Sequence, residues 1–343
     1  MIVKKSISEH FRNLLIINIF FILSLLQSCA TVQVIPDKIF HGISNYHYGD
    51  DRTNLTTFSH LVDSLSLNKE TKKLAEENIL DFLNSNATFA SKQFVCRKLR
   101  LIGTEKSVPT LSKLLNNRKT TNIARYALEN IQGNKVDKAL INSLDNPDKK
   151  IKIGIINTLA ARKTKNSVYA LGELLQNADN DIAIAAASAL GKIADKKAIA
   201  FLEEHFNSAN INFRNTLFDS YLLCIDNIAK QDKYEAYIYY TKFYKLDLPT
   251  NLKSAALNGI INTAKNKKEE ILIRIKNEPT ELKSIAISKI RELPESTDIT
   301  VYAELLKTLP PENQIQLLSV FEDRKDKSVK PKLFNFLIPI LIT

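Results

Sequence analysis

Apolar residues recur at helical spacing in one segment after another along most of the chain. Val108 is followed by Leu111, Leu114 and Leu115, and Val168 opens a segment with the same pattern. Spacings of three and four residues place these side chains on one face of a helix. A Val or Ile opens each such helix, at Val108, Val136, Val168, Ile199, Ile271, Val301 and Val329. The period of about 30 residues predicts an array of stacked helix pairs, least regular near residues 232–265. An earlier pair is predicted at roughly residues 69–83 and 87–101.

The second helix of each pair has a pattern of its own. Residues 177–195 contain an acidic turn and then an Ala-rich helix, whose apolar positions are Ile182, Ala185, Ala186, Ala189, Leu190 and Ile193. Small side chains let neighbouring helix axes approach to about 8–10 Å. We therefore predict that Ala186 and Ala189 face neighbouring helices. Serine precedes several first helices, where its hydroxyl is predicted to cap the N-terminus, at Ser107, Ser167 and Ser328.

The segment from Ile182 to Asp195 resembles the second helix of HEAT repeats, in particular the short bacterial repeats that also occur in phycobilin lyases. In that family an Arg usually follows the Val or Ile of the second helix. Basic residues fill this place at Lys152, Arg214, Lys253 and Lys283, whereas Ala124 and Ala183 depart from it. The resemblance covers about residues 69–343. It implies an all-α fold, a right-handed α-solenoid of about eight to nine stacked helix pairs.

Solenoids of this kind usually bind partners rather than catalyse reactions. The resemblance therefore implies a scaffold, not an enzyme, that binds a protein partner through the surface lined by the second helices, where the four basic residues lie. One alternative follows from the lyase relatives, namely a lyase-like or enzyme-associated subunit that holds a cofactor or substrate. Another is a HEAT-like nucleic-acid binder, against which an exported N-terminus argues.

The N-terminus carries an export signal. Lys4, Lys5 and Arg12 precede an apolar run from Leu14 to Leu26. This run is too short to span a bilayer comfortably but suits a signal-peptide core. Leu26-Gln27-Ser28-Cys29 resembles the lipobox of bacterial lipoproteins, although Gln27 replaces the commoner small residue. A signal anchor, or an ordinary signal peptide with an accidental cysteine, is the alternative.

If residues 26–29 are a lipobox, Cys29 is the lipidated residue, and the chain is predicted to have three parts. These are a signal peptide over residues 1–28, a tether over 29–52 and a solenoid over 53–343. We expect the protein in the cell envelope, lipid-anchored in the outer membrane and facing the periplasm. More than one acyl chain would give stable anchoring.

The remaining cysteines, Cys96 and Cys224, lie among apolar helix positions about four repeats apart. A disulfide needs Cα atoms within about 7 Å. We therefore expect two free, buried thiols that pack as small hydrophobic residues.

The chain is basic, with a formal net charge of +11. Cations gather in the loops after second helices, at Arg162, Lys163, Lys165, Lys196, Lys197, Lys265, Lys267, Lys268, Arg324, Lys325 and Lys327. They form either a positive rim for an anionic partner or membrane surface, or ordinary complements to the helix dipoles.

Two further segments are candidate partner-binding sites. Six aromatic residues lie between Tyr234 and Tyr244, and among them Tyr237, Tyr239 and Tyr240 are candidates for a peptide or glycan platform. The alternative is that they fill an oversized interface between irregular repeats. Near the C-terminus an apolar helix contains Leu333, Phe334, Leu337 and Ile338. An uncovered apolar repeat end favours a partner contact or self-association, unless the last helix folds back and caps itself.

No catalytic constellation is apparent. His41, His47 and His60 lack the spacing of a zinc site, and no glycine-rich phosphate loop or nucleophile elbow occurs. We therefore expect no catalytic residue, no metal site and no bound cofactor.

Overall fold

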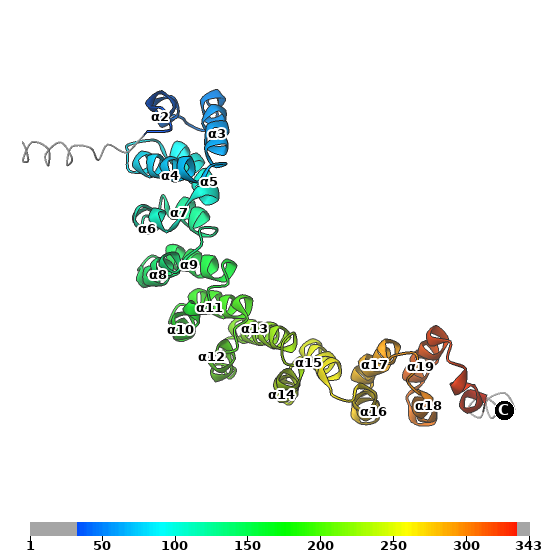
Figure 1. Ribbon diagram of the computed structural model, residues 1–343. Helices are drawn as coiled ribbons and strands as arrows, with labels where there is room; N and C mark the ends of the chain where they lie inside the picture. Colours follow the sequence, from blue (N-terminus) through cyan, green and yellow to red (C-terminus); the bar gives the residue numbers. More distant parts are fainter. Residues whose placement is uncertain (1–32, 335–343) are drawn as a thin grey trace, which may run out of the picture. The chain divides into compact units, whose positions relative to one another are not determined.

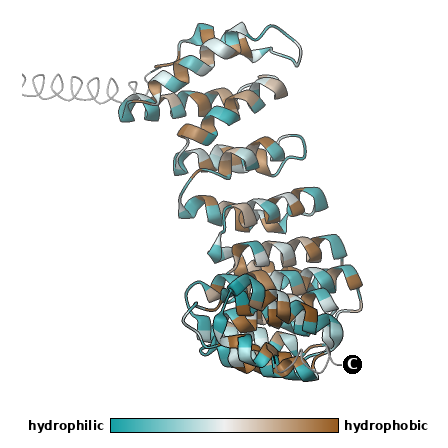
Figure 2. Ribbon diagram, turned by 90° about the vertical axis from the view of Figure 1, so that its right-hand side faces the viewer, coloured by the Kyte–Doolittle hydropathy of each residue, from teal (hydrophilic) through white to brown (hydrophobic). Residues whose placement is uncertain are grey.

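The computed structural model describes residues 33–334, which form helices and turns and contain no strand. The helices follow one another as antiparallel pairs (Figure 1). Figure 2 shows hydrophobic and hydrophilic residues alternating along the helices, as expected for helices that bury one face. The predicted all-α class of stacked helix pairs is confirmed. The chain divides into two compact units, Met1–Gly154 and Ile155–Thr343.

The first unit contains helices α2 (Asp37–Ser44), α3 (Thr53–Leu65), α4 (Lys69–Leu83), α5 (Phe89–Ile102), α6 (Val108–Leu115), α7 (Thr121–Leu128), α8 (Asn134–Asn142) and the start of α9 (Lys149–Ala161). Within this unit α4 packs on α5 and α6 packs on α7. The second helices of these two pairs, α5 and α7, also pack on each other. The predicted pair over residues 69–83 and 87–101 corresponds to α4 and α5.

The segment assigned to the tether is folded in its described part, residues 33–52, where α2 packs against the next helix. Ile35 and Ile43, at the two ends of α2, have no exposed surface. The Asn78 side chain on α4 accepts hydrogen bonds from the amides of Val34 and Ile35, at 3.0 and 3.1 Å. The contacts that hold this segment on α4 join residues more than 40 positions apart, so they were not evident in the sequence.

The second unit contains α10 (Val168–Glu173), α11 (Asn180–Ile193), α12 (Ala198–Glu204), α13 (Ile211–Ala229), α14 (Lys233–Tyr244), α15 (Thr250–Thr263), α16 (Lys267–Asn277), α17 (Thr280–Ser288), α18 (Thr300–Ala303) and α19 (Pro311–Arg324). The second helices α11, α13, α15, α17 and α19 pack on one another in sequence. The first helices α10 to α18 lie beside them as partners.

Small residues permit the close stacking of second helices. Ala186 and Ala189 on α11 are buried, with 0 % and 1 % of their surface exposed. A Cβ atom added to Gly191 would lie 2.7 Å from the Cα atom of Ser220 on α13. The predicted contact between the Ala-rich helix and its neighbour is confirmed.

The predicted serine caps are wrong in detail. Ser107 and Ser167 make no side-chain cap to α6 or α10, because a 3-10 turn precedes each helix. Ser107 instead donates to the buried carboxylate of Glu76, at 2.6 Å. Thr104 supplies the cap one turn earlier, since its hydroxyl accepts from the Lys106 amide at 3.2 Å. Ser107 therefore serves the contact between repeats, whereas Ser167 donates locally to the Thr164 carbonyl at 2.7 Å.

Several second helices end in a left-handed residue that is not glycine. Lys163, Ala194 and Lys325 have φ values of 53°, 53° and 52°. Each follows a second helix, α9, α11 or α19, where glycine is the residue without a steric cost.

The two internal cysteines are free and buried, as predicted. The predicted partner-binding residues near the C-terminus differ in their surroundings. Leu333 packs against the core of the second unit, whereas Phe334 is 67 % exposed. Leu337 and Ile338 lie outside the described residues, as does Cys29 with the predicted signal peptide. Within residues 33–334 no helix combines the length and the apolar character needed to cross a bilayer.

Candidate functional site

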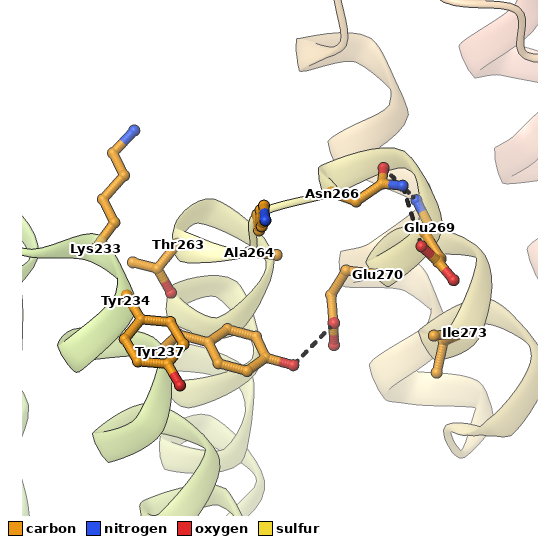
Figure 3. Close-up of a pocket in the computed structure, with 10 residues that line it drawn as sticks. Lys233, Tyr234, Tyr237, Thr263, Ala264, Asn266, Glu269, Glu270 and Ile273 are labelled. Atoms are coloured by element: carbon orange, nitrogen blue, oxygen red, sulfur yellow. Dashed lines mark hydrogen bonds between the residues drawn. The ribbon is translucent and has the colours of Figure 1, made fainter.

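A hollow of about 640 Å³ lies between α14, the end of α15 and α16 (Figure 3). Its lining residues are Lys233, Tyr234, Tyr237, Thr263, Ala264, Lys265, Asn266, Glu269, Glu270 and Ile273. We call it the α14–α16 hollow. It lies in the irregular repeat, where no Val or Ile opens the first helix.

Aromatic residues on α14 explain the departure from regular packing. Phe243 is fully buried, with its ring centroid 5.1 Å from that of Tyr221 on α13. Tyr240 lies against α15, where a Cβ atom at Gly259 would come within 2.4 Å of its ring. These rings direct α14 against α13 and α15. First helices pack directly on one another at α6 with α8 and at α10 with α12, but between α14 and α16 a hollow remains.

Buried polar side chains join α14 to α16 at the base of the hollow. The Tyr237 hydroxyl donates to Glu270, at 3.1 Å, and Figure 3 shows this side chain reaching across from α14. Arg274 donates to Glu270 at 2.7 Å and to Glu278 at 2.9 Å. Tyr244 donates to Glu278 and stacks near Arg274.

One guanidinium, that of Arg274, serves both carboxylates of this network. Burial opposes the charge of Arg274, but its hydrogen bonds to Glu278 and Glu270 raise its pKa overall. Burial, together with the charge of Glu270, raises the pKa of Tyr237. Tyr237 therefore stays protonated and acts as a hydrogen-bond donor. The network is a structural clamp, since each carboxylate already has a cationic partner.

The mouth of the hollow combines exposed apolar side chains with charged and amide groups. Among the apolar residues that line it, Tyr234 is 75 % exposed and Ile273 is 43 % exposed. Lys233 points away from the Glu270 carboxylate (Figure 3). This combination of exposed aromatic and aliphatic groups beside a hollow can accept an apolar side chain of a partner.

The three predicted tyrosines do not form one platform. Tyr237 lines the hollow, but Tyr240 is 3 % exposed and donates to Asp226. Tyr239 is half-buried, with its ring 6.5 Å from that of Tyr221. Each helical residue is rotated about 100° from the last, so consecutive tyrosines face different neighbours. For Tyr240 the alternative of interface filling is the correct one.

The basic residues predicted on second helices are half-buried at Lys152, Arg214, Lys253 and Lys283. Lys283 has an evident structural role, because its ammonium donates to the carbonyls of Ile275 and Lys276 at the end of α16, at 2.6 and 3.1 Å. Such a contact suits the negative end of a helix.

The predicted positive rim is partly neutralised. Lys196 pairs with Glu235, and Lys267 pairs with Glu292 at 2.7 Å. Arg324 donates to carbonyls at the end of the preceding repeat, including that of Leu293 at 2.6 Å. For these cations the alternative interpretation applies, because they complement helix ends and acidic neighbours.

A second hollow, of about 450 Å³, lies on the second helices of the first unit. Gln93 and Arg97 on α5 and Asn122, Ile123 and Tyr126 on α7 line it. We call it the α5–α7 groove. These residues were not predicted from the sequence, although the lack of acidic residues in α5 and α7 could have indicated a basic surface there.

Groups of three or more acidic, histidine or cysteine side chains placed to hold a metal do not occur among residues 33–334. Burial raises the pKa of both Cys96 and Cys224 to about 12, so neither thiol is poised as a nucleophile.

A family comparison agrees with this architecture. No curated protein matches the chain. Residues 138–217, from within α8 to within α13, match the family described as HEAT repeats. This match, within an all-α array of stacked helix pairs, supports a HEAT-repeat protein.

Proposed function

We propose that this protein is a lipid-anchored scaffold of the cell envelope that binds a protein partner and performs no catalysis of its own. HEAT repeats generally mediate protein–protein interactions and are typically non-catalytic. The observation that carries the proposal is the α14–α16 hollow with the exposed side chains of Tyr234 and Ile273 at its mouth.

The mouth has the composition of an interface hot spot. Tyrosine is enriched at such positions because it offers a large apolar face and a polar tip. Tyr234 has no buried role to explain its presence, since three quarters of its surface is exposed. The clamp of Tyr237, Glu270 and Arg274 holds the hollow in shape, which lowers the entropic cost of binding.

Crosslinking and affinity capture from membranes test this surface. We expect the double variant Tyr234→Ala and Ile273→Ala to lose a partner that the parent protein recovers, because loss of a hot spot weakens binding about 30-fold or more. The matched control is Ile315→Ala on α19, which also removes an exposed isoleucine, here 70 % exposed. Equal recovery by all proteins would refute the assignment of this surface.

The anchor is a separate part of the proposal. It rests on the lipobox-like sequence ending in Cys29. Mass spectrometry of the mature N-terminus should find an acylated Cys29, and Cys29→Ser should abolish the modification. An unmodified N-terminus that begins at another residue would contradict the anchor and the proposed location.

One observation favours a second candidate function. The volume of the α14–α16 hollow falls within the range of about 300–1,000 Å³ that is usual for small-molecule sites. A subunit that holds a cofactor or substrate would retain it there. Native mass spectrometry of the purified protein would show a bound small molecule in that case, and capture of a protein partner alone would favour the scaffold.

A further inference from the structure

The second helices of the first unit are basic and contain no acidic residue. Over α5, α7 and the first turn of α9 the cations are Lys92, Arg97, Lys98, Arg100, Arg125, Lys149, Lys150 and Lys152, and Asp and Glu do not occur in these three helices. Among the first helices of the same unit, α4 and α8 mix both signs, and α6 has one cation, Lys113, and no acidic residue. The charge is thus concentrated on one set of helices.

Some of these cations have partners and others remain available. Lys98 pairs with Asp63 at 2.7 Å, and Lys92 donates to the Ser85 carbonyl at 2.6 Å. Arg97, which lines the α5–α7 groove, and Lys150 are exposed, and neither forms an ion pair within residues 33–334.

The groove is held by further contacts that orient its polar groups. The Arg100 guanidinium lies 4.4 Å from the centre of the Tyr126 ring, which is 41 % exposed. Arg125 donates to the Asn122 side chain at 2.6 Å and to the Gly154 carbonyl on α9 at 2.9 Å. The Arg125 guanidinium lies close to the α9 backbone, since a Cβ atom at Gly154 would lie 2.6 Å from its central carbon.

Amide groups complete the chemistry of the groove. The Gln93 oxygen accepts from the Tyr48 hydroxyl at 2.7 Å, and the Asn122 oxygen accepts from Arg125. Each side chain therefore keeps its NH₂ group as a donor toward a ligand. Burial lowers the pKa of Arg125, and the charge of Glu129, just after α7, partly offsets this effect.

We infer that the α5–α7 groove, with the adjoining Lys150 on α9, binds an acidic peptide segment in an extended conformation. Charge complementarity selects carboxylates, the amide donors suit peptide carbonyls, and the Tyr126 ring offers an apolar face. A peptide fits better than a membrane surface, because these groups line a hollow. Two helix-to-helix steps of about 8–10 Å correspond to about six extended residues.

This inference rests on the proposed function in taking a protein as the occupant. It concerns another unit and another ligand chemistry, so the two can fail separately. The probe is a short fluorescent peptide of alternating Glu and Ser, and its control is the same peptide with Gln in place of Glu. Fluorescence anisotropy with the full-length protein in a neutral detergent measures both affinities.

We expect the Glu peptide to bind more tightly than the Gln peptide, with an affinity that falls as salt rises. Arg97→Ala should weaken its binding about tenfold, as expected for loss of a charged hydrogen bond. Lys113→Ala on α6 also removes one exposed cation, but from a first helix, and should leave binding unchanged. Far-UV circular dichroism verifies that both variants are folded.

Three results would overturn the inference. They are equal affinity for the two peptides, equal loss in Arg97→Ala and Lys113→Ala, and binding of phosphatidylglycerol vesicles through Arg97 without binding of the Glu peptide. The last result would assign the groove to an anionic membrane surface. None of them bears on the α14–α16 hollow, whose variants are tested by partner capture.

Discussion

Gly191→Ala places two well-known effects in opposition. Alanine in a helix interior is favoured over glycine by about 1 kcal/mol, so helix propensity alone predicts a more stable protein. The structure predicts the opposite. The new Cβ atom would lie 2.7 Å from the Cα and Cβ atoms of Ser220 on α13. Ordinary van der Waals contact requires about 3.5–4.0 Å between carbon atoms, so the two helices must separate by roughly 1 Å.

Separation is costly here because α11 and α13 pack on each other and because the nearest atoms, Cα and Cβ of Ser220, cannot move without the α13 backbone. Overpacking of this kind costs about 1–3 kcal/mol. After the gain of about 1 kcal/mol in propensity, the net loss in the free energy of unfolding is up to about 2 kcal/mol. Urea denaturation followed by far-UV circular dichroism should show an earlier midpoint.

The matched control is Gly154→Ala. Its new Cβ atom would meet the guanidinium of Arg125, which is the end of a flexible side chain. We expect a smaller loss there than at Gly191. A later midpoint for Gly191→Ala would refute the reasoning, because propensity would then outweigh the contact between second helices.

Three further predictions concern local features. Lys163→Gly relieves a left-handed φ of 53° and should raise the thermal midpoint through a gain of about 0.5–1 kcal/mol, whereas Lys192→Gly inside α11 should lower it. A thiol-reactive dye at mildly alkaline pH should label Cys96 and Cys224 only after unfolding, because burial raises the pKa of both to about 12; fast labelling of the native protein would contradict this. Burial, and after it the hydrogen bond to Asp226, raises the pKa of Tyr240. The stability that protonated Tyr240 contributes is therefore complete below about pH 10 and is lost as the pH rises further. Tyr240→Phe should reduce the fall in the free energy of unfolding above pH 10.

The helix pairs could be predicted from sequence because their signals are local. The predicted ranges 69–83 and 87–101 lie close to α4 and α5. Ala186 and Ala189 could be assigned to a helix contact because a small residue on an apolar face has few other uses. The buried thiols followed from apolar neighbours in the same way.

Features that depend on contacts between distant residues could not be predicted. The packing of α2 requires Asn78, more than 40 residues away, to bind the amides of Val34 and Ile35. The fates of Tyr237 and Tyr240 depend on what faces them, which is Glu270 in one case and α13 with α15 in the other. Both residues are tyrosines in the same helical segment, so the sequence alone does not distinguish their roles.

The candidate surfaces lie where the repeat pattern is broken. In regular repeats the apolar residues of both helices are used in the core and the small residues in the stack, so few groups are left for a partner. At α14 aromatic residues replace the usual opening Val or Ile, and their packing against α13 and α15 leaves the hollow beside α16. At α7 the position after Ile123 is Ala124, and the cation stands one residue later, at Arg125, where it reaches Gly154 and borders the groove. Departures from the repeat are therefore where partner specificity can reside, and substitutions there should change binding with little effect on the array.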